Sequence, residues 1–223
     1  MMGPPAEEER DGCGLAALIL AAGRSTRMTG GSKLLCDFEG MTVIRRVAST
    51  ALSAGLEPVV VVLGHDARAV QSALSGLVVR YARVPGVPRG RLVSVIAGIE
   101  ALTEDPVLGA MVLLGDEPGL TADDIRTVRE AAAADRSIVW RAVFRDRPGH
   151  PVLLPEPVLR SVPDLARGHE PEFSLWNLIV RSGLPHSSVP IEGQAPVDID
   201  TRADLERAIQ RSGIDTQRVD RQG

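Results

Sequence analysis

The stretch LAALILAAGRSTRM, residues 15–28, decides how this chain folds. Its first part, Leu15 to Leu20, is a short and continuously apolar run that is closed by Gly23. A run of this kind is typical of a strand that is buried on both faces of a parallel sheet. The polar, glycine-rich stretch from Ala21 to Lys33 then predicts a loop at the carboxyl end of that strand.

The same pattern repeats along the chain. Two further buried strands are predicted at Pro58–Leu63 and Ala110–Leu114, and a short one at Val78–Ala82. Helical patterns lie between and after them, at residues 42–54, 67–74, 92–102 and 121–134. Strands that alternate with helices predict an α/β domain with a mostly parallel sheet and helices on both faces.

The alternation loosens after Val143, where prolines are frequent. Here we expect a strand at 138–143, extended pieces at 151–154, 187–190 and 197–199, and helices at 173–181 and 202–212. We therefore divide the chain into a disordered tail (1–14), a single domain (15–212) and a polar tail (213–223). Within the domain we separate a first half, residues 15–134, from a second half, residues 135–212.

Composition excludes several classes of protein. Hydrophobic residues make up 44% of the 223, which suffices for a sizeable core. The formal net charge of -4 argues against a nucleic-acid partner, because such proteins normally carry a basic excess. No apolar run predicts a signal peptide or a membrane span. Cys13 and Cys36 lack metal-ligand spacing, so we expect two free thiols in a cytoplasmic protein.

The loop after the first strand has the composition of a phosphate site. Small residues let backbone N–H groups approach phosphate oxygens, and Arg24, Arg27 and Lys33 can offset the charge of a triphosphate. Lys33 is the only lysine among the 25 basic residues. The Walker pattern fails because Leu34 follows the lysine, and no GxGxxG follows the strand. A polar surface loop with chance arginines remains the alternative.

A carboxylate stands at the end of a second strand, in Gly115-Asp116-Glu117-Pro118. Ligands of open parallel sheets bind beyond the carboxyl ends of the strands, so Asp116 should face the loop. Magnesium is held by one or two carboxylates plus phosphates and water, and either Asp198 or Asp200 can supply a second one. The alternatives are a turn-forming Asp116 and an Asp200 that caps the last helix.

Four motifs together resemble a known family, the MobA-like NTP transferases, and within it most closely the molybdenum cofactor cytidylyltransferases. They are LAAGRSTRM (20–28) followed by Lys33, GDEP (115–118), RPGHPV (147–152) and DIDTRADL (198–205). The resemblance covers about Leu15 to Ala208. It implies a Rossmann-like three-layer nucleotidyltransferase fold and a magnesium cofactor, held by Asp116 with Asp200 or Asp198.

The motifs and the loop chemistry together name the residues that we expect at the site. We expect Arg27, Lys33 and Asp116 to be catalytic. The expected nucleotide-binding residues are Leu20, Ala21, Ala22, Gly23, Arg24, Ser25, Lys33, Gly64, Gly90 and Ser94. The resemblance implies that Gly149 and His150 line the acceptor site. We accordingly expect residues 15–134 to be the nucleotide-binding half of the domain and residues 135–212 the acceptor-binding half.

Two positions bear on specificity. Guanylyl-transferring relatives usually carry LAGG, and the methyl of Ala22 stands where a purine edge would approach, which favours CTP. Glu117 replaces the Gln that is usual in the family. In addition, residues 167–173 lack the GDxGAR-like stretch that cytidylyltransferases usually carry near the acceptor.

The function that these observations predict is transfer of CMP from CTP to a small phosphorylated acceptor such as molybdopterin. Two alternatives remain open. One is an NAD(P)H-dependent reductase of the nicotine blue oxidoreductase type on the same scaffold. The other is a non-catalytic nucleotide-binding partner of a molybdenum enzyme, or of its chaperone. Fold alone does not choose among them.

Overall fold

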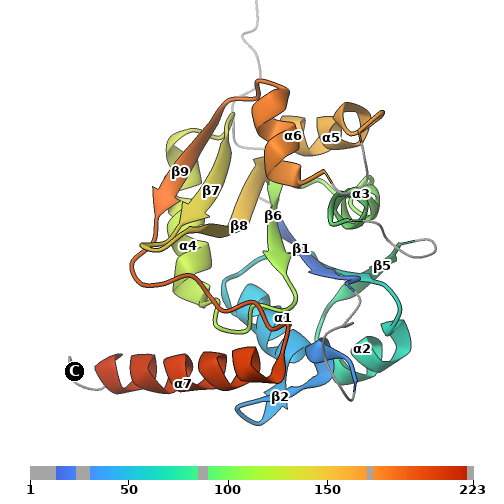
Figure 1. Ribbon diagram of the computed structural model, residues 1–223. Coiled ribbons are helices and arrows are strands. Elements are labelled where there is room, and N and C mark those ends of the chain that lie inside the picture. The colour runs from blue at the N-terminus through green and yellow to red at the C-terminus, as the bar shows by residue number, and fades with distance from the viewer. Residues whose placement is uncertain (1–13, 24–30, 85–89, 170–172, 220–223) are drawn as a thin grey trace, which may run out of the picture.

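A computed structural model describes residues 14–23, 31–84, 90–169 and 173–219, with the backbone alone for residues 213–219. A seven-stranded sheet in the order β5-β4-β1-β6-β8-β7-β9 forms its centre (Figure 1). Its strands are β1 (Leu15–Ala21), β4 (Val59–Leu63), β5 (Arg80–Arg83), β6 (Gly109–Leu114), β7 (Val139–Val143), β8 (Pro148–Pro155) and β9 (His186–Pro190).

The sheet is mostly parallel, as the sequence predicted. Strands β5, β4, β1 and β6 are parallel to one another, and β7 is parallel to β9. Strand β8 is antiparallel to both of its neighbours, β6 and β7. The register pairs Ala21 of β1 with Leu63 of β4, and Leu20 with Leu114 of β6. The three central strands therefore end at one edge of the sheet.

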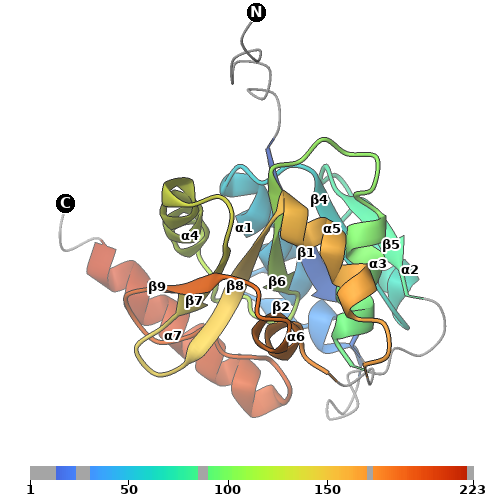
Figure 2. The same ribbon diagram turned by 90° about the horizontal axis from the view of Figure 1, so that it is seen from above.

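Helices cover both faces of the sheet (Figure 2). On one face lie α1 (Val43–Ser53), α2 (Ala67–Ala73) and α4 (Ala122–Ala134), and on the other α3 (Leu92–Glu100), α5 (Glu156–Leu165) and α6 (Leu175–Arg181). Alternate residues of each central strand feed the two cores, as the pleat requires: Ile19 packs in one and Leu18 in the other. This arrangement confirms the three-layer α/β fold.

Local signals set several boundaries correctly. Helix α4 begins after Thr121, whose side chain accepts from the backbone N–H of Asp124 at 3.1 Å. In turn, the side chain of Asp124 accepts from the backbone N–H of Thr121 at 2.9 Å. This capping box satisfies two backbone donors at the helix start. Helix α1 ends just before Gly55, which has a positive φ of 75°.

Other elements differ from the expectations. Helix α5 was not predicted, because its prolines Pro157 and Pro163 mask the helical pattern; its first turn tolerates Pro157. A small hairpin of β2 (Asp37–Phe38) and β3 (Met41–Thr42) was also missed, and it turns through Glu39 and Gly40, both with positive φ. Residues 197–199 join no strand.

The last helix, α7 (Arg202–Val219), is longer than the expected 202–212 and lies along the lower edge of the domain in Figure 1. It closes a small separate core in which Ala208 packs with Phe38, Val43 and Ile199. Its packing holds the preceding segment, residues 197–200, against the main domain. Among the described residues, no helix has the length and apolar character needed to span a membrane.

Candidate active site

The candidate site begins where β1, β4 and β6 end. Two glycines there let the chain segments pack closely. A Cβ at Gly64, after β4, would lie 2.4 Å from the carbonyl oxygen of Ala22, and one at Gly115, after β6, would lie 2.9 Å from that of Leu20. Only a residue without a Cβ fits such contacts. The three strand ends are thereby drawn together into one surface.

A cavity of about 260 Å³ opens over this surface. Its walls come from the end of β1, the 3₁₀ turn Lys33–Leu35, the start of α3 and the end of β6. The lining residues are Leu20, Ala21, Ala22, Gly23, Lys33, Leu34, Gly90, Arg91, Ser94, Leu114 and Asp116.

Most of the residues expected to bind nucleotide meet in this cavity. Gly64 does not line it and instead supports Ala22 from behind. Arg24, Ser25 and Arg27 lie outside the described residues. Sequence reasoning missed Leu34, Leu114 and Arg91; of these, Arg91 carried a signal, because it directly follows Gly90 at the start of a helix.

Lys33 occupies the centre of the site. Its Nζ donates to Oδ2 of Asp116 at 2.5 Å and to Oδ1 of Asp200 at 2.7 Å. The lysine side chain is 11% exposed, that of Asp116 15% and that of Asp200 42%. Burial of the ammonium lowers its pKa, but the charges and hydrogen bonds of the two carboxylates outweigh burial and raise the pKa overall. Lys33 is therefore held as a cation between two anions.

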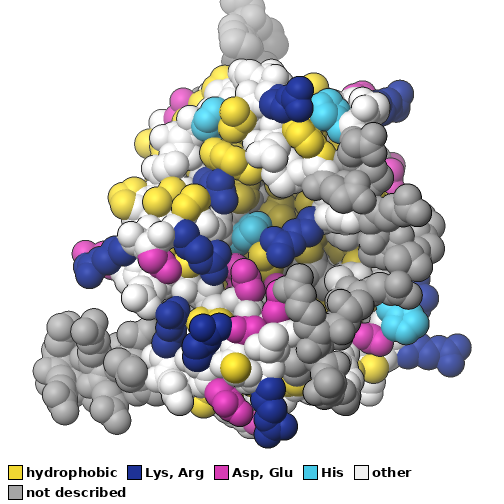
Figure 3. Space-filling model, viewed as in Figure 1, with side chains coloured by type: hydrophobic (Ala, Val, Ile, Leu, Met, Phe, Trp, Pro, Cys, Tyr) yellow, Lys and Arg dark blue, Asp and Glu magenta, His cyan; other side chains and the backbone are white. Residues whose placement is uncertain are grey.

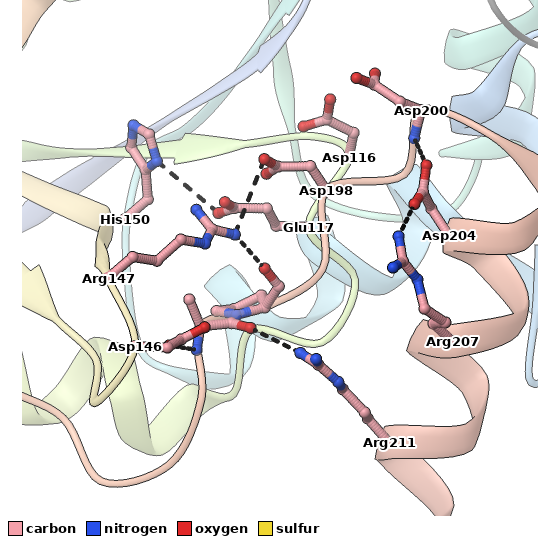
Figure 4. Close-up of polar contacts among 12 residues, drawn as sticks. Asp116, Glu117, Asp146, Arg147, His150, Asp198, Asp200, Asp204, Arg207 and Arg211 are labelled. Carbon is pink, nitrogen blue, oxygen red and sulfur yellow. Dashed lines mark hydrogen bonds and ion pairs between the residues drawn. The ribbon is translucent and has the colours of Figure 1, made fainter.

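A backbone bond explains why Asp200 reaches this position. The N–H of Ile199 donates to the carbonyl oxygen of Asp116 at 2.9 Å, which aligns residues 198–200 with the end of β6. Ile199 is fully buried in the small core that α7 closes, and residues 197–199 join no strand. The two neighbours of Ile199 therefore need not share one face, as residues two apart do in a regular strand. The carboxylate of Asp200 accepts from Lys33. Asp198 instead lies toward Glu117 and Arg147 (Figure 4).

Asp200 does not cap α7, which was the alternative role for this residue. The N–H of Thr201 donates to Oδ2 of Asp204 at 2.7 Å, and the N–H of Asp204 donates to Oγ1 of Thr201 at 3.2 Å. This reciprocal pair makes Thr201 the capping residue. Asp200 is therefore not the cap of α7, and its carboxylate contacts Lys33 instead.

A second cluster adjoins the first, on the side of β8. Nδ1 of His150 lies 3.9 Å from Oε2 of Glu117, and Arg147 lies 3.9 Å from Oδ2 of Asp198 (Figure 4). Burial, together with the positive charges of Arg91 and Arg141, lowers the pKa of His150 to about 3. The imidazole is therefore neutral at physiological pH.

Glu117 is almost completely buried, with 1% of its side chain exposed. Burial, then a hydrogen bond with Asp198 and the charges of Asp198 and Asp116, raise its pKa well above the ordinary value. A carboxyl group in such surroundings favours its protonated form. Glu117 then resembles the Gln that is usual at this position, because both present a donor and an acceptor.

Cations line the outer wall of this cluster. The guanidinium of Arg141 lies 4.7 Å from the ring centre of Trp176, and its Nε donates to the carbonyl oxygen of Gly149 at 3.4 Å. Arg147 donates to the carbonyl oxygen of Pro196 at 2.7 Å. In Figure 3, a histidine at the hollow of this face is flanked by Lys or Arg side chains, with carboxylates below it. The wall suits an anionic ligand.

The carboxylates suit a hard divalent cation that needs only one or two protein ligands. Within the described part of the chain, no three His, Cys, Asp or Glu residues gather to form a metal cage. Magnesium needs none, because it binds one or two carboxylates and completes its octahedron with phosphate oxygens and water. The donors around Lys33 fit that pattern, since two carboxylates already converge on one cation beside the cavity.

Comparison with known proteins likewise identifies similar nucleotidyltransferases. The family of MobA-like NTP transferase domains matches residues 17–181. The chain is 30% identical to a probable molybdenum cofactor guanylyltransferase of Natronomonas pharaonis, over 87% of this chain and 96% of that protein. It is 35% identical to the bifunctional protein GlmU of Anaeromyxobacter dehalogenans over 161 residues, which are 64% of this chain and 32% of GlmU.

A solved structure is similar along nearly its whole length. Rv0371c of Mycobacterium tuberculosis, in complex with manganese, superposes with a TM-score of 0.69 and 26% identity, covering 88% of this chain and 98% of that protein. The chain spans only about a third of the GlmU proteins it matches, but it spans nearly all of Rv0371c and of the probable guanylyltransferase.

Proposed function

Because the chain belongs to the family of MobA-like NTP transferase domains, we propose that it is a metal-dependent nucleotidyltransferase that moves CMP from CTP to a phosphorylated acceptor. The observation that carries this proposal is the meeting of Asp116, Asp200 and Lys33 beyond the strand ends, where Lys33 and Asp116 line the cavity. A triphosphate with a divalent cation is the ligand that needs both the cationic and the anionic groups found there.

The metal that we propose is magnesium, and Asp116 with Asp200 would hold it. This assignment of the second ligand rests on the side to which each aspartate turns, since Asp198 is engaged with Glu117 and Arg147. When bound, the ion would supply charge stabilisation at the phosphate oxygens. The related Rv0371c was solved with manganese, which supports a divalent cation in this fold.

The chemistry needs little from the protein beyond placement. An oxygen of the acceptor phosphate forms a bond to the α-phosphorus of the nucleotide, the bond from that phosphorus to the bridging oxygen breaks, and pyrophosphate leaves. A phosphate monoester is already nucleophilic, so no general base is required. Lys33 would offset the charge of the phosphates, and the residues at the end of β1 would fix their position.

The preference for CTP rests on Ala22. This residue is 2% exposed and lines the cavity directly after β1. Its methyl group takes up room that a larger purine ring would need, whereas a cytosine ring requires less. The guanylyltransferase name of one relative makes the base the first property to measure.

The acceptor side of the cleft supports an anionic substrate. Arg91 and Arg141 direct positive charge at a neutral His150, and Arg147 stands beside them. A phosphate group on the acceptor would match this wall. We propose a molybdopterin-type acceptor, in line with the motifs and with the name of the relative from Natronomonas.

One assay tests the proposal. Purified protein is incubated with molybdopterin and either CTP or GTP, with Mg²⁺ or with EDTA, and pyrophosphate release is followed. The expected result is release that requires Mg²⁺ and acceptor and is faster with CTP. A parallel assay with NADPH in EDTA tests the reductase alternative. Turnover of NADPH without pyrophosphate release from CTP would favour a reductase and contradict the proposal. Nucleotide binding without any turnover would favour a binding partner instead.

A further inference from the structure

The contacts of Lys33 bear on the order in which ligands bind. Its ammonium lies between the two carboxylates to which the proposed function assigns the metal, at 2.5 and 2.7 Å from their oxygens. Magnesium binds carboxylate oxygens at about 2.0–2.1 Å, so it would need the space that this ammonium fills. The lysine and the metal therefore compete for the same pair of ligands.

From this geometry we propose, resting on the proposed function, that Lys33 acts as an internal cation that blocks the metal site until a nucleotide arrives. The phosphates then offer Lys33 other anionic partners, and Asp116 and Asp200 become free to bind the metal. Metal and nucleotide binding are consequently coupled, and the metal binds weakly to the protein alone.

The position of Lys33 allows such an exchange without a change of fold. The residue lies on the 3₁₀ turn Lys33–Leu35 and lines the same cavity as Gly23, which follows β1. A Cβ built on Gly23 meets no atom of the described residues within 4 Å. The lysine chain of four methylene groups rotates freely enough to move its charge from the carboxylates toward Gly23.

The negative charges of the nucleotide favour the exchange of Lys33 for a metal ion at the two carboxylates. Without nucleotide, the ammonium offsets one of two negative charges that would otherwise repel each other. A triphosphate adds several negative charges and new oxygen ligands, so an additional divalent cation becomes favourable beside the displaced lysine. If the blocked arrangement holds at least nine-tenths of the protein, the apparent metal affinity falls at least about tenfold.

The first test measures Mn²⁺ binding to the full chain without nucleotide, from the electron paramagnetic resonance signal of the free ion. Lys33→Met, which keeps the apolar stem and removes the charge, should bind Mn²⁺ about tenfold or more tighter than the wild type. Arg147→Met is the matched control, because it removes one positive charge from the same cleft beside Asp198. This variant should change the affinity by less than about twofold.

A second measurement uses the wild-type protein, in case Lys33→Met folds poorly. Because Lys33 is the only lysine, labelling lysine with ¹⁵N at Nζ gives a single side-chain resonance. CTP should move this resonance, and Mg²⁺ should bind at lower concentration once CTP is present. Mg²⁺ alone should move it only at concentrations at least about tenfold higher.

The outcomes separate this inference from the proposed function. Equal gains in Lys33→Met and Arg147→Met would show a general effect of charge and overturn the blocking role. No gain in Lys33→Met, while the wild type binds Mn²⁺ with CTP, would overturn the blocking role alone. Absence of Mn²⁺ binding in every form, with CTP present, would contradict the metal-dependent transfer itself.

Discussion

Nζ of Lys33 donates to Oδ2 of Asp116 at 2.5 Å, although 83 positions separate the two residues in the chain. The bond joins the turn that follows β1 to the loop that follows β6. It places the only lysine of the chain against the carboxylate that the sequence singled out as a metal ligand. Two motifs are thereby combined in one site.

Nucleotide affinity should depend on Lys33. Lys33→Ala removes one charged partner of the phosphates, and a hydrogen bond to a charged group contributes roughly 1.5–3 kcal/mol, so CTP should bind about 10- to 100-fold more weakly. Isothermal titration of CTP measures this change. Arg46→Ala, which removes a partly buried cation paired with Glu39, is the control and should leave the affinity unchanged. Equal CTP affinity in Lys33→Ala and the wild type would refute the role.

The two aspartates of the last motif should differ in function. Asp116→Asn and Asp200→Asn should both abolish Mg²⁺-dependent transfer while weakening CTP binding only modestly, since the loop still holds the phosphates. Asp198→Asn should keep the metal requirement and instead raise the KM for the acceptor, because Asp198 contacts the cluster of Glu117 and Arg147. Steady-state kinetics with varied Mg²⁺ and acceptor separate these cases. Loss of Mg²⁺-dependent transfer in Asp198→Asn, with transfer retained in Asp200→Asn, would reverse the assignment.

Base selection should weaken when Ala22 loses its methyl group. In Ala22→Gly the ratio of kcat/KM for CTP over GTP should fall, by a free energy of up to ~1–3 kcal/mol, which is the range for one methyl or methylene in a pocket. A competition assay with both nucleotides gives the ratio directly. Ala21→Gly removes a methyl from the neighbouring lining residue and serves as the control. A wild-type protein that uses GTP as well as CTP would contradict the prediction.

Glu117→Gln should stabilise the protein at neutral and alkaline pH. Since the pKa of Glu117 is raised in the folded state, the unfolded chain loses this proton first as the pH rises above its ordinary value of 4.5. Each further pH unit then costs the wild type up to ~1.4 kcal/mol, until the folded-state pKa is reached. Urea unfolding should show equal stabilities near pH 4 and a more stable variant at pH 8. An unchanged difference across this range would disprove the raised pKa.

His150 should make the protein sensitive to mild acid. Its folded-state pKa of about 3 lies below the ordinary 6.5, so the unfolded chain takes up a proton first as the pH falls. Stability contributed by the neutral imidazole is complete above pH 6.5 and declines below it, by up to ~1.4 kcal/mol per unit. His150→Gln should remove this decline, whereas His65→Gln, at an exposed position, should keep it. Parallel pH profiles for wild type and His150→Gln would rule out the assignment.

Much of the fold could be predicted because buried parallel strands have a local signature. The apolar runs that became β1, β4 and β6 are continuous, short and closed by glycine, and the structure extends or trims them by one residue at most. Elements that depend on context were missed. Helix α5 contains Pro163, and the β2–β3 hairpin has too few residues for any periodicity.

The sequence by itself determined which residue types carry the chemistry: one lysine in a loop after the first strand, a carboxylate after another, and two aspartates near the end of the chain. Only the tertiary structure favours Asp200 over Asp198 as the proposed metal ligand. In a regular extended segment, side chains two positions apart share one face, so alternation alone does not separate the two aspartates. Burial of Ile199 against α7 and its backbone bond to Asp116 fix the rotation of this segment, and such contacts between distant segments have no local trace in the sequence.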